Sequence, residues 1–203
     1  MAKRRAQQKA LTANRLFAAA LRLFREHGFE ATTVEQITRA AGVAKGTFFT
    51  HFASKDAILD HIGQFQMERI GAALAADPTF AQLPLRAQLR TIFRTLAGGL
   101  TQQPAEMRAL NIEIIARRSL FDIDPDGIGK LDRLIEELVA AGQAHGHIRS
   151  DAPVARIAVL IRSSYFLAVF EWLRNDSLDL VELAYQHLDL VLEGLATHMH
   201  DQE

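Results

Sequence analysis

Hydrogen-bond donors gather in one short stretch of this chain, between residues 33 and 55. They comprise two ammonium groups, three hydroxyls, an imidazole and a glycine that lets a backbone N–H come close to a partner, and they are Thr33, Lys45, Gly46, Thr47, Thr50, His51 and Lys55. Donors outnumber acceptors, so the set suits an anion such as a phosphate. The alternative is a group of ordinary solvated surface residues.

Two short helices joined by a tight turn are expected to position these donors, in the segment TVEQITRAAGVAKGTFFTHFASK. The hydroxyl of Thr32 or Thr33 can cap the first helix, with Glu35 or Gln36 reaching back to complete a capping box. Gly42 supplies the backbone freedom that ends this helix and turns the chain.

The second short helix is expected over about residues 44–52. Phe48 and Phe52 lie four positions apart on one face, so the opposite face carries the donors together with Phe49, a large apolar side chain in water. A supporting helix from about residue 11 to Gly28 carries an apolar stripe formed by Leu16, Phe17, Ala20, Leu23 and Phe24. The pattern predicts three helices around one small core, a helix-turn-helix.

Residues 34–55 resemble the DNA-binding segment of TetR-family transcriptional regulators, and GVAKGTFFTHFASKDAIL is close to the usual pattern of that family. The resemblance implies a role for each donor. Thr33 and Lys55 would grip phosphates, Lys45, Gly46 and Thr47 would enter the major groove, and Phe49 and His51 would lie along the DNA backbone.

Two positions depart from the usual pattern of the family. Phe49 stands where Tyr is most frequent, so the phenolic hydrogen bond to a phosphate is missing and only packing against a sugar or a thymine methyl remains. Thr50 replaces the more common aromatic residue or His. These departures concern the preference for particular bases and leave double-stranded DNA as the expected partner.

Charge divides the chain near the same place. Residues 1–56 carry 10 Lys and Arg against 4 Asp and Glu, whereas residues 57–203 carry 13 against 20. A basic arm formed by Lys3, Arg4, Arg5 and Lys9 could lie on phosphates or reach into the minor groove, or it could be a disordered terminus. A basic head and an acidic body predict a polyanion-binding domain joined to a domain with another task.

Composition predicts an all-α fold, because Ala and Leu are abundant and Gly and Pro do not cluster. We expect a helix-turn-helix DNA-binding domain over residues 1–53, and a helical ligand-binding and dimerisation domain over residues 54–203. The chain has no cysteine, no signal peptide and no apolar run long enough to span a membrane, which favours a cytoplasmic protein.

The body is expected to consist of helices alone. Their approximate ranges are 54–76, 85–102, 105–119, 128–144, 153–175 and 178–198, with cap-like residues at Asp151 and at Asp176 or Ser177. The first of them would link the head to the body.

The last two helices predict a homodimer. The final helix has a coiled-coil seam beside a second apolar row, formed by Val181, Ala184, Leu188, Val191 and Leu195 and by Leu180, Leu183 and Leu190. The helix before it is apolar nearly all round and must be covered on two sides. The resemblance likewise implies a two-fold dimer through a four-helix bundle, which would read a palindromic operator; the alternative is a monomer with a thick core.

The resemblance also implies a small-molecule effector that binds in the body and releases DNA. Phe65, Phe93, Phe166 and Trp172 are candidate walls of its site, or plain core. Asn111 interrupts an apolar stripe and would bind the effector or a neighbouring helix, and Arg162 would meet an anionic ligand or form an ion pair between subunits. We expect an apolar or aromatic effector.

Other patterns are weak. Asp122, Asp124 and Asp126 open like a calcium loop but lack its closing glutamate, and the pairs His145 and His147, and His198 and His200, lack further ligands. Glycine loops for phosphates and nucleophile elbows are missing. We therefore expect no metal, no cofactor and no enzymatic activity.

Together these observations predict a ligand-responsive, dimeric transcriptional regulator, most simply a repressor. Two alternatives remain at this stage. The chain could be a helical small-molecule carrier or interaction module whose head merely looks like a DNA reader, or an architectural DNA binder that responds to no ligand.

Overall fold

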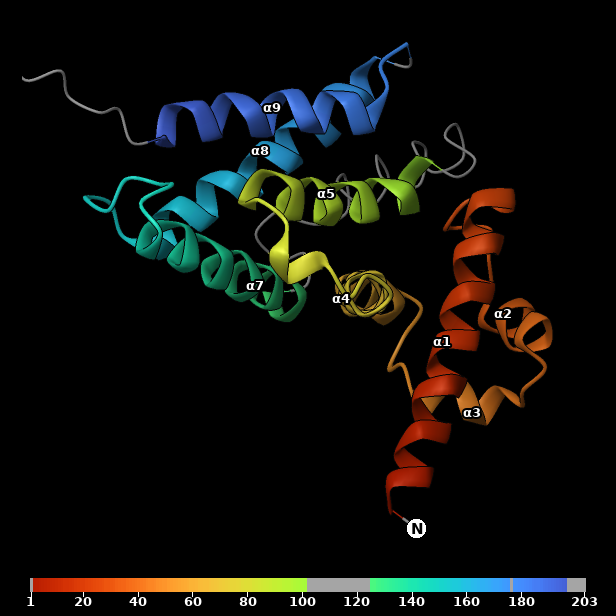
Figure 1. The fold of residues 1–203 in the computed structure, drawn as a ribbon. Coiled ribbons are helices and arrows are strands. Elements are labelled where there is room, and N and C mark those ends of the chain that lie inside the picture. Colours follow the sequence, from red (N-terminus) through yellow and green to blue (C-terminus); the bar gives the residue numbers. More distant parts are fainter. Residues whose placement is uncertain (1, 102–124, 176, 197–203) are drawn as a thin grey trace, which may run out of the picture. The chain divides into compact units, whose positions relative to one another are not determined.

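The computed structural model describes residues 2–101, 125–175 and 177–196, and every regular element in these ranges is helical (Figure 1). The helices of the first half are α1 (Ala2–His27), α2 (Val34–Ala41), α3 (Lys45–Phe49), the 3-10 helix η1 (Asp56–His61), α4 (Ile62–Ala75) and the 3-10 turn η2 (Phe80–Gln82). Those of the second half are α5 (Leu85–Thr101), α7 (Pro125–Ala144), α8 (Val154–Arg174) and α9 (Leu180–Leu195). The expected all-α fold is confirmed.

The described residues pack into two units, and the first of them contains residues 1–65. Helix α1 packs on α2, α2 packs on α3, and η1 packs on α1. The side chains they share are almost fully buried, among them Leu16, Phe17, Phe24, Ile37, Phe48, Phe52 and Ile58. This is the expected three-helix core, and the domain boundary that we placed after residue 53 stays a prediction.

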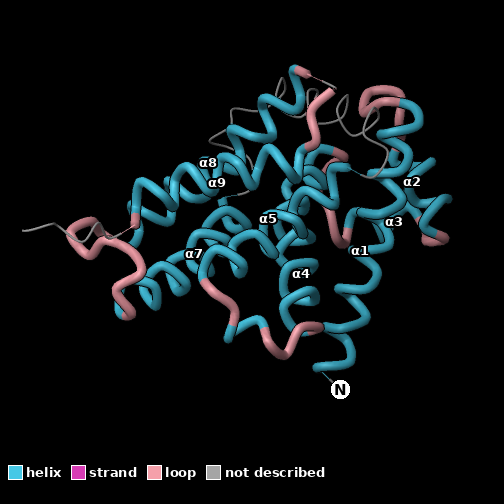
Figure 2. The backbone as a smooth tube through the Cα atoms, turned by 45° about the horizontal axis from the view of Figure 1, so that its top comes forward, coloured by secondary structure: helices cyan, strands magenta, loops and turns pink. Residues whose placement is uncertain are grey.

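The second unit contains residues 66–102 and 126–203, and its described helices include α5, α7, α8 and α9 (Figure 2). Helix α9 lies against both α8 and α5. Asp189 of α9 forms ion pairs with Arg86 and Arg90 of α5 at N–O distances of 2.6 and 2.5 Å. Charge as well as apolar surface therefore holds these helices together. Asp179 caps α9 by accepting hydrogen bonds from the backbone N–H groups of Val181 and Glu182.

Several helix ends differ from the expected ones. Helix α1 begins at Ala2, so the basic arm is part of the helix, although the side chains of residues 3–5 lie outside the described part. The expected long helix from residue 54 begins instead as η1 and becomes α-helical at Ile62. The expected helix over residues 105–119 lies outside the described residues.

Two of the expected caps were wrong. Asp151 pairs with Arg149 at 2.6 Å, and α8 begins after Pro153 without a side-chain cap. Asp179 caps α9 in place of Asp176 or Ser177, because α9 begins only at Leu180. Within the described ranges, no helix combines the length and the apolarity that crossing a bilayer requires.

Candidate nucleic-acid interface

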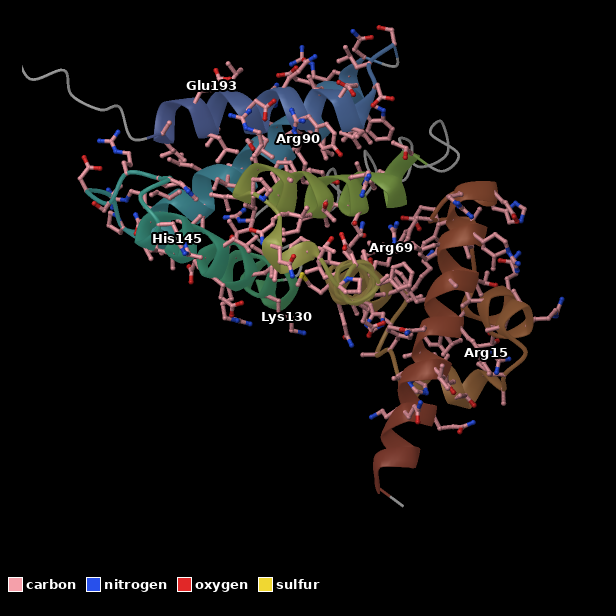
Figure 3. The ribbon with its side chains drawn as sticks, in the orientation of Figure 1. Arg15, Arg69, Arg90, Lys130, His145 and Glu193 are labelled. Carbon is pink, nitrogen blue, oxygen red and sulfur yellow. The ribbon has the colours of Figure 1, made fainter. Side chains whose placement is uncertain are left out.

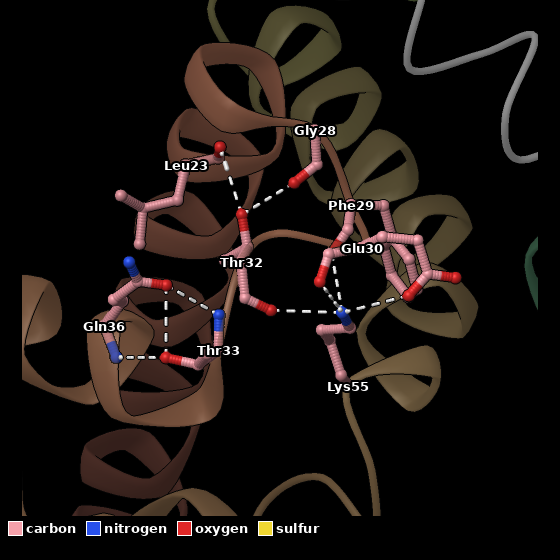
Figure 4. Close-up of polar contacts among 8 residues, drawn as sticks. All are labelled: Leu23, Gly28, Phe29, Glu30, Thr32, Thr33, Gln36 and Lys55. Carbon is pink, nitrogen blue, oxygen red and sulfur yellow. Dashed lines mark hydrogen bonds and ion pairs between the residues drawn. The ribbon is translucent and has the colours of Figure 1, made fainter.

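Thr33 and Thr32, adjacent in sequence, have different tasks at the start of α2 (Figure 4). The Thr33 hydroxyl accepts a hydrogen bond from the backbone N–H of Gln36, whose side chain accepts one from the backbone N–H of Thr33. Thr32 is 1% exposed and donates its hydroxyl to the carbonyl of Gly28 at 2.8 Å. The structure thus selects Thr33 as the cap and Gln36 as its partner, and leaves Thr33 exposed at the surface.

The turn between α2 and α3 depends on Gly42. This residue has φ 66° and ψ 40°, a left-handed conformation that glycine adopts without steric cost. The guanidinium of Arg15 in α1 donates to the carbonyl of Ala41 at 2.6 Å, so it caps the end of α2. The supporting helix therefore fixes the direction in which α3 leaves the turn.

Helix α3 has one buried and one exposed aromatic face. Phe48 is fully buried, whereas Phe49 is 52% exposed and meets the edge of the Phe48 ring at a centroid distance of 5.3 Å. Lys45, Gly46 and Thr50 are exposed, and Thr47 and His51 are half-buried. The hydroxyl of Thr50 donates to the carbonyl of Thr47 at 2.7 Å, which caps the end of the helix.

Lys45 forms an ion pair with Glu35 of α2, across the turn. The ammonium is the main cause that holds the pKa of the Glu35 carboxyl below its usual range. Both side chains are more than half exposed, so water weakens their attraction. The expected DNA-contacting cation thus already has an acidic neighbour, one that can be exchanged for a phosphate.

His51 is shifted toward its neutral form. Burial lowers the pKa of its imidazole, and the positive charge of Lys9 in α1 lowers that pKa further. The charge of Lys9 in α1 therefore acts on His51 at the end of α3. We assign the two residues to the same basic surface. A neutral imidazole donates one hydrogen bond, and a protonated one donates two.

The Lys55 side chain has partners within the protein, and its expected grip on a phosphate stays a prediction. Its ammonium donates to the carbonyls of Phe29 at 2.6 Å, Thr32 at 3.0 Å and Glu30 at 3.3 Å (Figure 4). It also lies 4.3 Å from the centroid of the Phe29 ring. An ammonium has three donors, and all three are directed at the loop between α1 and α2. The Lys55 side chain therefore stabilises the loop that carries Thr33.

The sequence model described as "Bacterial regulatory proteins, tetR family" matches residues 16–62, which contain this whole arrangement from α1 to η1. Over this segment the chain is similar to the TetR family. Individual relatives match it over nearly the full length. It is 26% identical over 184 residues to the HTH-type transcriptional repressor KstR2 of Rhodococcus jostii, covering 90% of both chains.

Two further relatives are a regulator of fatty acid metabolism and a repressor solved with an acyl-CoA. The chain is 28% identical over 200 residues to the fatty acid metabolism regulator protein of Bacillus subtilis, covering 93% of this chain and 98% of the relative. It is 29% identical to FadR of Thermus thermophilus, a TetR-family repressor solved in complex with lauroyl-CoA, with a TM-score of 0.61 and coverage of 94% and 98%. These relatives are transcriptional regulators.

Among the expected effector residues that the structure describes, Phe93 and Phe166 both contact Tyr165, and the guanidinium of Arg162 lies 5.7 Å from the centroid of the Phe166 ring. Phe93 is fully buried, Trp172 is 2% exposed, and Phe166 lies 5.9 Å from Tyr165 between ring centroids. Phe65 packs against Phe17 of the first unit, 5.0 Å between ring centroids. Asn111 lies outside the described residues, as do the three aspartates of the calcium-like loop.

Arg162 corrects one expectation. Its Nε donates to Oδ1 of Asp132 in α7 at 2.6 Å, and both side chains are about four-fifths buried. Arg162 therefore forms an ion pair within the subunit. Of the partners that we expected for it, neither an anionic ligand nor a second subunit is needed.

Two of the pairings in this interface could not be predicted from the sequence. Glu35 and Lys45 are ten residues apart on opposite sides of a turn, and Lys9 and His51 lie on different helices. The one indication in the sequence was the strong excess of cations over anions in this half of the chain, which favours a cation near each anion.

Proposed function

We propose that this protein is a dimeric transcriptional repressor that binds a palindromic operator through α3 and is released from it by a small amphipathic molecule. The DNA-binding surface would be formed by Thr33, Lys45, Gly46, Thr47, Phe49, Thr50 and His51. Binding to bacterial DNA would place the protein in the cytoplasm.

Gly46 carries the DNA-binding part of this proposal. A Cβ added to Gly46 would meet no atom within 4 Å, and its φ is not in the left-handed region. A helical glycine costs about 0.5–1 kcal/mol relative to alanine, yet nothing in the free protein requires it. A DNA backbone or base edge that approaches α3 closely would require a residue without a side chain at this position.

The proposed dimer rests on apolar surface in the second unit. Val159, Leu160 and Leu167 of α8 are exposed, and Leu190 of α9 is 69% exposed. Ala184, Leu188 and Leu195 of the expected seam are buried within the chain, as are Leu180 and Leu183 of the second row, so Leu190 is the residue of that row left for a partner. Two copies that pair α8 and α9 would remove this surface from water.

Two-fold symmetry would then place two copies of α3 on successive major grooves, with half-sites about 34–36 Å apart or somewhat more. Leu190→Asp would introduce a charge into the proposed interface. We expect this variant to sediment as a monomer and to lose most of its affinity for the full operator. A dimer of unchanged stability would contradict the proposed interface.

The effector class is proposed from the relatives. FadR of T. thermophilus was solved with lauroyl-CoA, and a structural neighbour is described as the ketosteroid transcriptional regulator KstR2 of Mycobacterium tuberculosis. Both descriptions point to molecules with a large apolar part. For this chain we propose an amphipathic molecule with a long apolar portion.

The first experiment measures binding to DNA from the protein's own upstream region and to a scrambled duplex, over a range of salt concentrations. We expect a preference of roughly 10³-fold or more, with protection of a palindrome. Gly46→Ala should keep the thermal midpoint of the wild type and bind the operator more weakly, while Gly71→Ala in α4 serves as the control. Equal, salt-sensitive binding to both duplexes would contradict the proposal.

A further inference from the structure

Arg69 of α4, labelled in Figure 3, lies beside two glycines of α5 in the second unit. A Cβ on Gly99 would lie 2.1 Å from Nη1 of Arg69, and one on Gly98 would lie 3.6 Å from Nη2. The guanidinium therefore lies against a part of α5 that only a glycine leaves open. Two adjacent glycines cost a helix about 1–2 kcal/mol relative to alanine, so this close approach needs a reason.

Within the described residues, the charge of Arg69 is only partly satisfied. Its Nη1 donates to Oε1 of Gln66, one turn earlier in α4, at 3.3 Å. Among the residues that the structure describes, no carboxylate lies within ion-pair distance of it, and the guanidinium is half-buried. By contrast, Arg162 and Arg90 of the same unit each pair with an aspartate. A guanidinium withdrawn from water favours an anion as its partner.

Tyr165 of α8 provides a second donor in the same unit as Arg69. Its side chain is 5% exposed, and its ring lies 5.3 Å from that of Phe93 between centroids. Burial raises the pKa of the Tyr165 hydroxyl, and the positive charge of Arg69 acts on the same hydroxyl in the opposite direction. The hydroxyl is therefore neutral and can donate a hydrogen bond within the electrostatic reach of the guanidinium.

We propose that Arg69 and Tyr165 bind the anionic head of the effector, with Gly98 and Gly99 leaving room for the guanidinium. The ligand is an acyl chain that ends in an anion, either the carboxylate of a fatty acid or a phosphate of its coenzyme A thioester. The guanidinium provides paired N–H donors for the anion, and the phenol provides a third. The proposal rests on the proposed function for the existence of an effector.

The test is a calorimetric titration of the full-length protein with laurate, lauroyl-CoA and the uncharged 1-dodecanol. We expect the wild type to bind one of the anionic probes more tightly than dodecanol, and the preferred probe identifies the source of the anion. Arg69→Gln should weaken that probe about tenfold or more and leave dodecanol unchanged. Arg94→Gln, an exposed arginine of α5, is the matched control.

Gly99→Ala gives an independent test of the same geometry. The added Cβ would displace the guanidinium, so this variant should also lose affinity for the anionic probe while its helix gains intrinsic stability. A merely structural Arg69 would instead lower the thermal midpoint in Arg69→Gln and leave probe preference unchanged. That result, or a wild type that binds neither anionic probe, would overturn the proposal.

Release of operator DNA, followed by fluorescence anisotropy, separates this proposal from the proposed function. Anion binding that depends on Arg69 but releases no DNA would overturn the proposed regulation and leave the anion site intact. Release by lauroyl-CoA that is the same in wild type and Arg69→Gln would overturn the anion site and leave the regulation intact.

Discussion

The head and the body of this protein use ion pairs in opposite ways. In the head, Lys45 and Glu35 are 56% and 54% exposed, whereas in the body Arg162 and Asp132 are 18% and 22% exposed. An exposed pair contributes little to folding and can exchange partners, while a buried pair cannot lose one member without leaving a charge unpaired. The comparison indicates that Lys45 stays available to another partner, whereas Arg162 is committed to Asp132.

The largest effect should come from the buried pair. Arg162→Met leaves Asp132 unpaired, and we expect the free energy of unfolding to fall by about 2–4 kcal/mol. Denaturant unfolding followed by circular dichroism measures this loss. Combining Arg162→Met with Asp132→Leu should recover most of the lost free energy of unfolding. If Arg162→Met alone were as stable as the wild type, the buried pair would not differ from the exposed pair in its contribution to folding.

Lys55 shows that one cation of the head is structural. Lys55→Met removes three hydrogen bonds to the loop between α1 and α2, and should destabilise the head by about 1.5–3 kcal/mol. Lys45→Met, its exposed counterpart, should leave the unfolding midpoint unchanged. Equal midpoints in the two variants would show that the Lys55 ammonium is not held by these carbonyls.

Glu35 and Lys45 should change DNA affinity in opposite directions. Lys45→Met should weaken operator binding and lower the slope of log affinity against log salt by about one. Glu35→Gln should strengthen binding about threefold, because Lys45 is freed and a charge that repels phosphate is removed. Both are read from anisotropy titrations at several salt concentrations. A loss of affinity in Glu35→Gln would mean that the carboxylate itself positions Lys45 for DNA.

The smallest expected effect is a pH dependence carried by His51. In the free protein, burial and Lys9 lower the pKa of His51, whereas a nearby DNA phosphate would raise it. Binding would then take up a proton, so affinity should increase as the pH falls from about 7.5 to 5.5. His51→Gln should show a flatter profile over this range. An identical profile in both proteins would exclude His51 from the phosphate contact.

Much of the head could be predicted from its sequence because its signals are local. The signals are a threonine cap followed three residues later by glutamine, a glycine at the turn, and Phe48 and Phe52 on one face. The residues of each signal are no more than about one helical turn apart. Phe49 was expected in water for the same reason and is 52% exposed. The ends of α1, α8 and α9 were less certain, because several residues in each neighbourhood could serve as caps.

The sequence by itself determined that the chain is helical, where its turn lies, and that its donors are on the outer face of α3. Only the tertiary structure decided which charges meet. Lys55 is directed at a loop 23–26 residues earlier, Arg162 at an aspartate 30 residues away, and Arg69 at Gly99. Helix periodicity fixes which residues share a face, but the packing of separate helices fixes which faces meet, and long charged side chains reach across that packing to partners that spacing alone does not specify.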